Sequence, residues 1–192
     1  MGEFKPNKQD LLAAQNKSIA DVIAPNLKVL FCGINPGLWS GATGHHFAKP
    51  GNRFWKTLHL AGFTERLLLP HEKNVLLENG YGITNVVERT TARADELAAE
   101  EFVAGGERLV KKIKKFKPTY LAVLGIGAYR TAFNQPKAAL GLQNELIGQT
   151  RLWVLPNPSG LNAHYQLNDL ARLYGELKQA VETSGEINSI QK

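Results

Sequence analysis

Short, almost entirely apolar segments recur along the chain, and they have the length of buried β-strands. There are four of them: 27–32, 81–87, 120–124 and 152–155. Beside them lie segments with apolar residues at helical spacing. These segments predict helices over 10–23, 54–60, 99–116, 128–133 and 169–181. Apolar strands that alternate with helices are typical of an α/β protein whose parallel sheet is covered by helices on both faces.

The two ends of the chain differ from the rest in composition. Residues 1–9 and 185–192 are mostly polar, whereas no linker, repeat or change of composition interrupts the chain between them. A length of 192 residues suits one large domain with a full core. We therefore predict a single domain over 10–184 with a flexible tail on each side.

The overall composition is that of an ordinary globular protein. Hydrophobic residues make up 43% of the chain, and 23 basic against 17 acidic residues give a net charge of +6. This charge favours polyanionic partners only weakly. The chain has no apolar run of the roughly 18 residues that span a membrane, and its first ten residues lack the core of a signal peptide. We expect a soluble, cytoplasmic protein with no membrane partner.

The single cysteine restricts the cofactors that the chain could hold. Cys32 alone cannot form an internal disulfide, a Cys-rich zinc site or a Cys-ligated iron–sulfur cluster. Its place inside an apolar strand favours a core thiol over a nucleophile. The pair His71 and Glu72 lacks the second histidine of a zinc-protease helix, so we expect no metal.

Two familiar enzyme motifs are present only in part. The segment 125–130 begins like a dinucleotide-binding loop but has Arg130 where the last small residue belongs, so we expect no nucleotide cofactor. Ser159, His164 and Asp169 could be imagined as a hydrolase triad. The residues around the serine are not those of a nucleophile elbow, and the acid follows the histidine instead of preceding it.

Three unusual loops follow the predicted strands, at 33–51, 84–91 and 157–164. In open α/β sheets, ligands bind beyond the carboxyl ends of the strands, where these loops lie. The chemistry of the protein should therefore be built from them.

The first two loops hold an amide, a ring and a second amide. Asn35 carries a donor, an acceptor and no charge, so it could hold a water molecule, although an Asn-Pro turn explains it equally well. Phe47 offers a stacking face for a flat ligand, or else anchors its loop in the core. Asn85 can pair at once with a carbonyl and an N–H, which is the edge of a pyrimidine imide.

The third loop and the basic residues bear on a nucleic-acid partner. The turn 157–161 ends in Leu161, which suits a wedge between stacked bases; the alternative is a leucine that packs under the last helix. The basic run over 108–117 favours a solvated helix face. Arg53, with Lys49 and Lys56, is better placed to meet phosphates.

Taken together, these features resemble the mismatch-specific uracil/thymine DNA glycosylases, the G·U/G·T mismatch branch of the uracil-DNA glycosylase superfamily. The resemblance runs from about residue 23 to 181. It is carried by LFCGINPGL at 30–38, GNRFWK at 51–56, GITNVVERTT at 82–91, the pair Gly105-Gly106, and NPSGL at 157–161. It implies a three-layer α/β/α domain with a short, mainly parallel sheet, acting as a base-flipping enzyme.

The resemblance also implies roles for residues of the first two loops. Asn35 matches the residue that positions the attacking water, and Thr91 supports that water. Phe47 matches the aromatic that stacks on the flipped base, while the backbone at Ile34 and Phe47 binds a base carbonyl. Asn85 matches a position that contacts the edge of the base. Asn35 stands where other uracil glycosylases have an aspartate, which implies slow turnover.

The third loop matches the part of the family that enters the duplex. Gly160 and Leu161 correspond to the wedge that fills the space left by the base and contacts the orphaned guanine. Asn157 and Ser159 shape that turn and touch backbone phosphates. His164 lies where relatives often carry an arginine, which is a departure from the pattern.

We therefore expect a monofunctional hydrolase of base excision repair, since no lysine nucleophile is evident in these loops. Its substrate would be double-stranded DNA with a G·U or related mismatch, with thymine and ethenocytosine as further candidate bases. We expect it to act as a monomer, without cofactor or metal, in a bacterial-type cytoplasm. The alternative is a non-catalytic protein on the same fold that binds lesions or abasic sites. A small-molecule enzyme is disfavoured by the basic charge and the missing cofactor motifs.

Overall fold

A five-stranded sheet in the order β2-β1-β3-β5-β4 forms the centre of the computed structural model, which describes residues 4–190. Four strands are parallel: β1 (Val29–Gly33), β2 (Tyr81–Asn85), β3 (Tyr120–Leu124) and β5 (Thr150–Leu155). The edge strand β4 (Gly141–Ile147) pairs antiparallel with β5. The predicted α/β class with a mainly parallel central sheet is confirmed.

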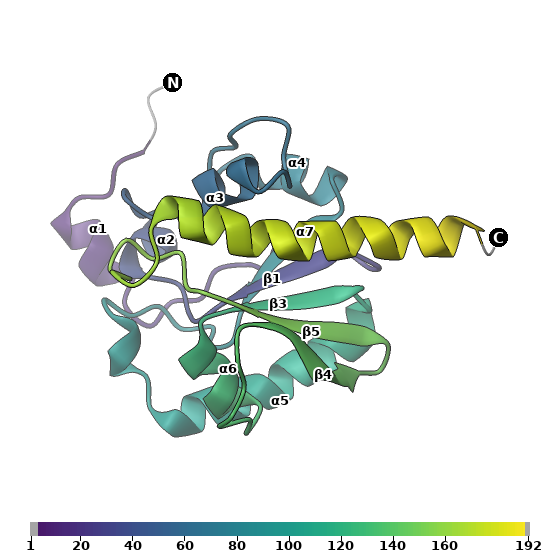
Figure 1. The fold of residues 1–192 in the computed structure, drawn as a ribbon. Helices are drawn as coiled ribbons and strands as arrows, with labels where there is room; N and C mark the ends of the chain where they lie inside the picture. The colour runs from purple at the N-terminus through teal and green to yellow at the C-terminus, as the bar shows by residue number, and fades with distance from the viewer. Residues whose placement is uncertain (1–3, 191–192) are drawn as a thin grey trace.

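Helices cover both faces of the sheet, as Figure 1 shows. One face carries α3 (Phe54–Leu60), α4 (Lys73–Glu78) and the long α7 (Leu167–Ile190). The other carries α5 (Ala99–Phe116) and α6 (Ile126–Ala132). Two short helices, α1 (Lys8–Ala13) and α2 (Leu38–Thr43), pack against each other, and a 3-10 turn, η1 (Ala94–Glu96), precedes α5.

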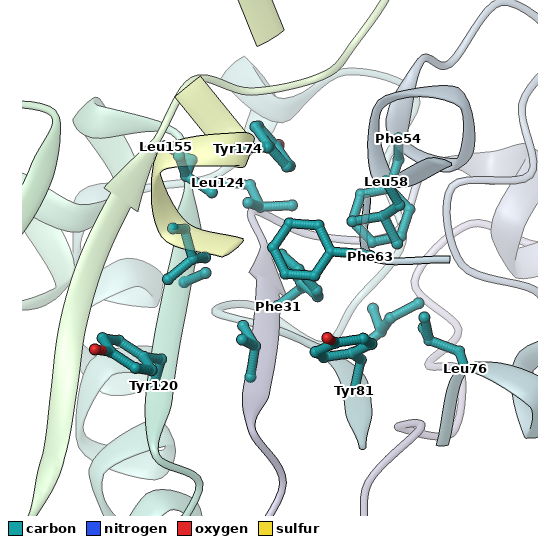
Figure 2. Close-up of a cluster of buried hydrophobic side chains, with 14 of the residues drawn as sticks. Phe31, Phe54, Leu58, Phe63, Leu76, Tyr81, Tyr120, Leu124, Leu155 and Tyr174 are labelled. Atoms are coloured by element: carbon teal, nitrogen blue, oxygen red, sulfur yellow. The ribbon is translucent and has the colours of Figure 1, made fainter. Parts of the chain in front are cut away.

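Alternation along the strands divides the core into two layers. In β1, Phe31 belongs to the layer under α3 and α7, whereas Leu30 and Cys32 belong to the layer under α5 and α6. Figure 2 shows Phe31 at the centre of the first layer, where its ring meets those of Phe54 and Phe63 edge-on. Strands with both faces buried explain the nearly continuous apolar segments of the sequence.

The predicted helix over 10–23 is wrong beyond its first turns. Asn7 caps α1 early, and the helix ends at Ala13. Asn16 then adopts a left-handed conformation with φ of 61°, which breaks the helical path. The apolar residues that follow serve a different purpose, because Val22 pairs antiparallel with Ile83 of β2 through two backbone hydrogen bonds.

Other boundaries differ from the predictions as well. The sequence pattern missed β4, α2 and α4, and it ended the last helix at 181, whereas α7 continues through Ile190. Part of the predicted C-terminal tail is therefore helical, and the predicted N-terminal tail includes the first residues of α1. Residues 1–3 and 191–192 of those tails lie outside the described residues.

A helix-to-helix contact without side chains gives a testable prediction about stability. A Cβ at Gly106 of α5 would press into the carbonyl oxygen of Ala132 in α6. We expect Gly106→Ala to lower the free energy of unfolding by about 1–3 kcal/mol, despite alanine's better helix propensity. Urea unfolding measures this change.

The matched control is Gly175→Ala in α7, where a Cβ would have no atom within 4 Å. Here only the helix propensity changes, so stability should rise by about 0.5–1 kcal/mol. Equal effects of the two substitutions would contradict the close approach of α5 and α6.

Candidate functional site

One cleft of about 410 Å³ lies beyond the carboxyl ends of β1, β2 and β5. Eight of the nine residues predicted for the site line it: Ile34, Asn35, Phe47, Asn85, Thr91, Asn157, Ser159 and Leu161. The ninth, Gly160, lies between Ser159 and Leu161 in the same loop. The three loops predicted from the sequence thus meet in one place.

The side-chain amide of Asn35 is held in one orientation. Its Nδ2 donates to the carbonyl oxygen of Arg89 at 3.0 Å and to Oγ1 of Thr91 at 2.7 Å. Two acceptors on one side require the nitrogen there, so Oδ1 takes the other position. Within residues 4–190, no group donates a hydrogen bond to that oxygen. Asn35 therefore presents a free acceptor at the cleft.

Thr91 acts on this amide rather than on the cleft directly. Its hydroxyl accepts from Asn35 and donates to the carbonyl oxygen of Arg93 at 2.7 Å. Because a hydroxyl has a single proton, Thr91 has none left to give to a water molecule. The structure thus places Thr91 behind Asn35, as a support for the amide.

The loop that carries Thr91 is fastened to the loop that carries Asn35. Backbone N–H groups of Val86 and Val87 donate to the carbonyls of Gly33 and Ile34, both at 2.9 Å. The Arg89 side chain forms an ion pair with Glu101 at 2.6 Å. Hydrogen bonds from Arg89 lower the pKa of Glu101 to about 2, so this link to α5 persists in mild acid.

Phe47 anchors its loop against α3 and also lines the cleft. It stacks on Phe54 of α3, with ring centroids 4.0 Å apart and planes 22° apart. Its backbone is left-handed, with φ of 54°, a conformation that bulky side chains rarely adopt. The stack on Phe54 fixes the plane of the Phe47 ring, and its stacking on a flat ligand stays a prediction.

Asn85 is oriented by a histidine whose role the sequence did not reveal. Nδ2 of Asn85 lies 3.3 Å from Nδ1 of His46, and Nε2 of His46 lies 3.0 Å from the carbonyl oxygen of Ala20. A carbonyl only accepts, so Nε2 carries the proton and Nδ1 accepts from the amide. The close approach also needs Gly33, where a Cβ would lie 2.5 Å from Oδ1 of Asn85.

This arrangement requires a neutral His46. Burial lowers the pKa of the ring below its ordinary 6.5, and it outweighs the opposing effects of the Ala20 carbonyl and the Asp21 carboxylate. The charges of Lys73 and His45 lower the pKa further. Only the adjacency of His46 to Phe47 in the sequence could have pointed to it.

The third loop, which lines the cleft, is held in shape by hydrogen bonds between its own residues. Oδ1 of Asn157 accepts from the N–H of Ser159 at 3.0 Å, and Oγ of Ser159 accepts from the N–H of Leu161 at 3.3 Å. Asn157 and Ser159 thus shape the turn, as predicted. Their contact with phosphate stays a prediction. Leu161 is 78% exposed, so it does not pack under the last helix. His164 is exposed as well.

The sequence suggested that Arg53 faces outward toward phosphates, and this prediction is wrong. Its guanidinium turns into the third loop and donates to backbone carbonyls there. Lys49 lines the cleft and Lys56 is exposed on α3, so these two remain available. In the basic run 108–117, Lys112 is likewise engaged, in an ion pair with Asp21 at 2.5 Å.

The other features considered from the sequence lie outside the cleft. Cys32 is buried, and burial raises the pKa of its thiol, in keeping with a core residue. Asp169 accepts from the N–H of Gln166 at the start of α7, and no hydrogen bond joins it to Ser159 or His164 within the described chain.

A larger hollow of about 900 Å³, beside Lys117 and Arg151, contains none of the predicted site residues.

Residues 4–190 contain neither a metal-binding cluster nor a helix that could span a membrane. No group of three or more histidine, cysteine or acidic side chains is placed to hold a metal ion in this part of the chain. No helix within it is long and apolar enough to cross a membrane.

The neutral His46 gives a prediction about pH. Its folded pKa lies below 6.5, so on acidification the unfolded chain takes up the proton first. Stability is therefore full above pH 6.5 and falls as the pH drops from 6.5 toward the lower folded pKa. The slope contributed by this one group approaches about 1.4 kcal/mol per pH unit. We expect His46→Gln, which cannot titrate, to remove that component from urea unfolding measured between pH 7.5 and 5.5.

A His164→Gln variant is the matched control, because that ring is exposed. It should retain the pH dependence of the natural protein. If His46→Gln and His164→Gln gave the same curves, the buried neutral histidine would be refuted.

Comparisons with known proteins identify the fold and the family of the chain. The chain is similar in structure to a Methanosarcina acetivorans protein provisionally named a uracil DNA glycosylase, whose structure was solved by solution NMR. The TM-score is 0.60 at 18% sequence identity, over 87% of this chain and 98% of the other, which shows a shared fold. The sequence profile of the Uracil DNA glycosylase superfamily matches residues 20–178, a span that contains all three loops of the cleft. The chain belongs to the uracil DNA glycosylase superfamily.

Proposed function

We propose that the protein is a monofunctional DNA glycosylase that removes uracil from G·U mismatches in double-stranded DNA. The observation that carries this proposal is the amide of Asn35, fixed through Nδ2 and open at Oδ1, in a cleft that Phe47 and Asn85 also line. Such a group orients a water molecule but is too weak a base to deprotonate it beforehand.

The proposed reaction requires the water site to orient the water molecule but not to deprotonate it. The bond between C1′ of the sugar and N1 of the base breaks, and its electron pair leaves with the base. The oxygen of the water held by Asn35 then bonds to C1′, and its proton is released to solvent. An oxocarbenium-like sugar is electrophilic enough to capture a neutral water, so no carboxylate is required at position 35.

The leaving base needs a flat support and hydrogen-bond donors. Phe47, stacked on Phe54, supplies the support. No carbonyl of residues 4–190 accepts from the backbone N–H of Phe47, and we assign this donor to a base carbonyl. Asn85 has a second Nδ2 proton beyond the one that faces His46, and its Oδ1 can accept, which matches the edge of uracil. Donors that face the carbonyls stabilise the departing anion.

Leu161 completes the proposal from the side of the duplex. A leucine that is 78% exposed at the tip of a hydrogen-bonded turn suits insertion into the space left by the flipped base. Thymine and ethenocytosine remain further candidate bases, and their relative rates depend on the width of the cleft.

The proposed activity is tested on a labelled duplex that holds one G·U pair. With enzyme in excess over DNA and without added metal, alkali should cleave the strand at the former uracil. Absence of cleavage would refute the proposal. Tight binding to the mismatch without release of uracil would instead favour a non-catalytic lesion-binding protein.

Replacement of Asn35 tests the water site. We expect Asn35→Ala to bind the G·U duplex like the natural protein but to lower the single-turnover rate about 100-fold or more, because the water loses its orientation. Asn144→Ala, which removes an exposed amide of β4, is the control and should leave the rate unchanged. An unaltered rate in Asn35→Ala would remove the residue from the mechanism.

Replacement of Leu161 tests the wedge. We expect Leu161→Ala to dissociate from the abasic product about 10-fold faster, because an apolar contact inside the duplex is lost. Leu146→Ala, at a leucine of β4 that is 59% exposed, should dissociate like the natural protein. Equal product affinity in both variants would argue against insertion of Leu161.

A further inference from the structure

Arg53 is a half-buried basic residue whose side chain contacts backbone carbonyls of another loop. Its Nε donates to the carbonyl oxygen of Pro158 at 3.3 Å, and Nη1 donates to that of Tyr165 at 2.5 Å. Nη2 donates to Ser159 at 2.5 Å and to Asn162 at 3.0 Å. One guanidinium thus binds four carbonyls of the loop 157–165, which we call the wedge loop.

The guanidinium of Arg53 binds these carbonyls and has no acidic partner among the described residues. No carboxylate lies within ion-pair distance of its guanidinium in the described part of the chain. A planar fork with five N–H donors suits several carbonyls that converge from one loop, whereas a lysine ammonium provides only a point charge. The residue therefore has the geometry of an internal clamp.

The clamp acts on both sides of the exposed leucine. Ser159 and Asn162, which share Nη2 of Arg53, flank Leu161 in the chain. The backbone adds a second attachment, because the N–H of Arg53 donates to Pro158 at 3.1 Å. Gly160 rests on the segment before Arg53 so closely that a Cβ there would lie 2.7 Å from the carbonyl oxygen of Gly51. Arg53 and the segment before it thus hold the tip that carries Leu161.

We propose that Arg53 is a positioning residue, which holds the wedge loop in the conformation that enters DNA. The proposal rests on the proposed glycosylase function and adds a residue to it. A preorganised loop loses little conformational freedom when it inserts Leu161, so opening of a base pair is favoured. Loss of the clamp should therefore impair removal of a paired uracil and spare the chemical step.

The test compares two substrates at single turnover, with Arg53→Lys as the variant. One substrate holds uracil in a G·U pair, and the other holds an unpaired uracil in a single strand. We expect the rate on the G·U pair to fall about 10-fold or more, because the clamp is lost. The rate on unpaired uracil should change less than about 2-fold, because no pair has to be opened.

Two further proteins sharpen this comparison. Arg172→Lys, at an arginine of α7 outside the cleft, should match the natural protein on both substrates. If Arg53 acts through Leu161, the double variant Arg53→Lys/Leu161→Ala should be no slower on the G·U pair than Leu161→Ala alone. Equal losses on both substrates, no loss on either, or fully additive losses would each overturn the proposal.

Hydrogen exchange provides a measurement that does not depend on activity. In Arg53→Lys, the backbone amides of 159–165 should exchange faster, while those of β1 and β3 stay protected. Slow exchange in the loop of the variant would overturn the clamp. If the natural protein released no uracil from any substrate, the proposed function would fail, and the exchange experiment would still decide whether Arg53 holds the wedge loop.

Discussion

The parallel pairing of β1 with β2 in one register is the constraint on which the site depends. Gly33 lies opposite Asn85, and the pairing continues past the strands as hydrogen bonds from Val86 and Val87. The two loops therefore leave the sheet side by side, which brings Thr91 to Asn35. A shift of one residue would turn Asn85 to the other face of the sheet and separate every contact that orients the two amides.

The centre of the cleft is built from neutral polar groups whose orientation is fixed by their neighbours. Asn35 is oriented by a carbonyl and a hydroxyl, and Asn85 by a histidine that burial keeps neutral. Charged pairs such as Arg89 with Glu101 lie behind the loops and hold them. This arrangement suits the proposed reaction. Fixed dipoles that are not already paired with a carboxylate can stabilise the negative charge of the leaving base.

Patterns within one element could be predicted from the sequence, whereas contacts between distant elements could not. The helix 99–116 and the strand 120–124 occur with the predicted bounds, since the strand is buried throughout and the helix turns one apolar face, with Leu109 and Ile113 buried, toward the core. The edge strand β4 was missed because it is largely exposed and has no continuous apolar run. Arg53 was misassigned because its partners lie more than 100 residues away, where no local pattern connects them.

The first turn of α3 joins the two halves of the site. Phe54 supports the ring of Phe47, and the preceding residue, Arg53, holds the wedge loop. Successive residues of a helix point about 100° apart, so one side chain can enter the core while its neighbour faces the loop. In the proposed reaction, the ring that receives the base and the loop of the leucine that replaces it are therefore both attached to the start of α3.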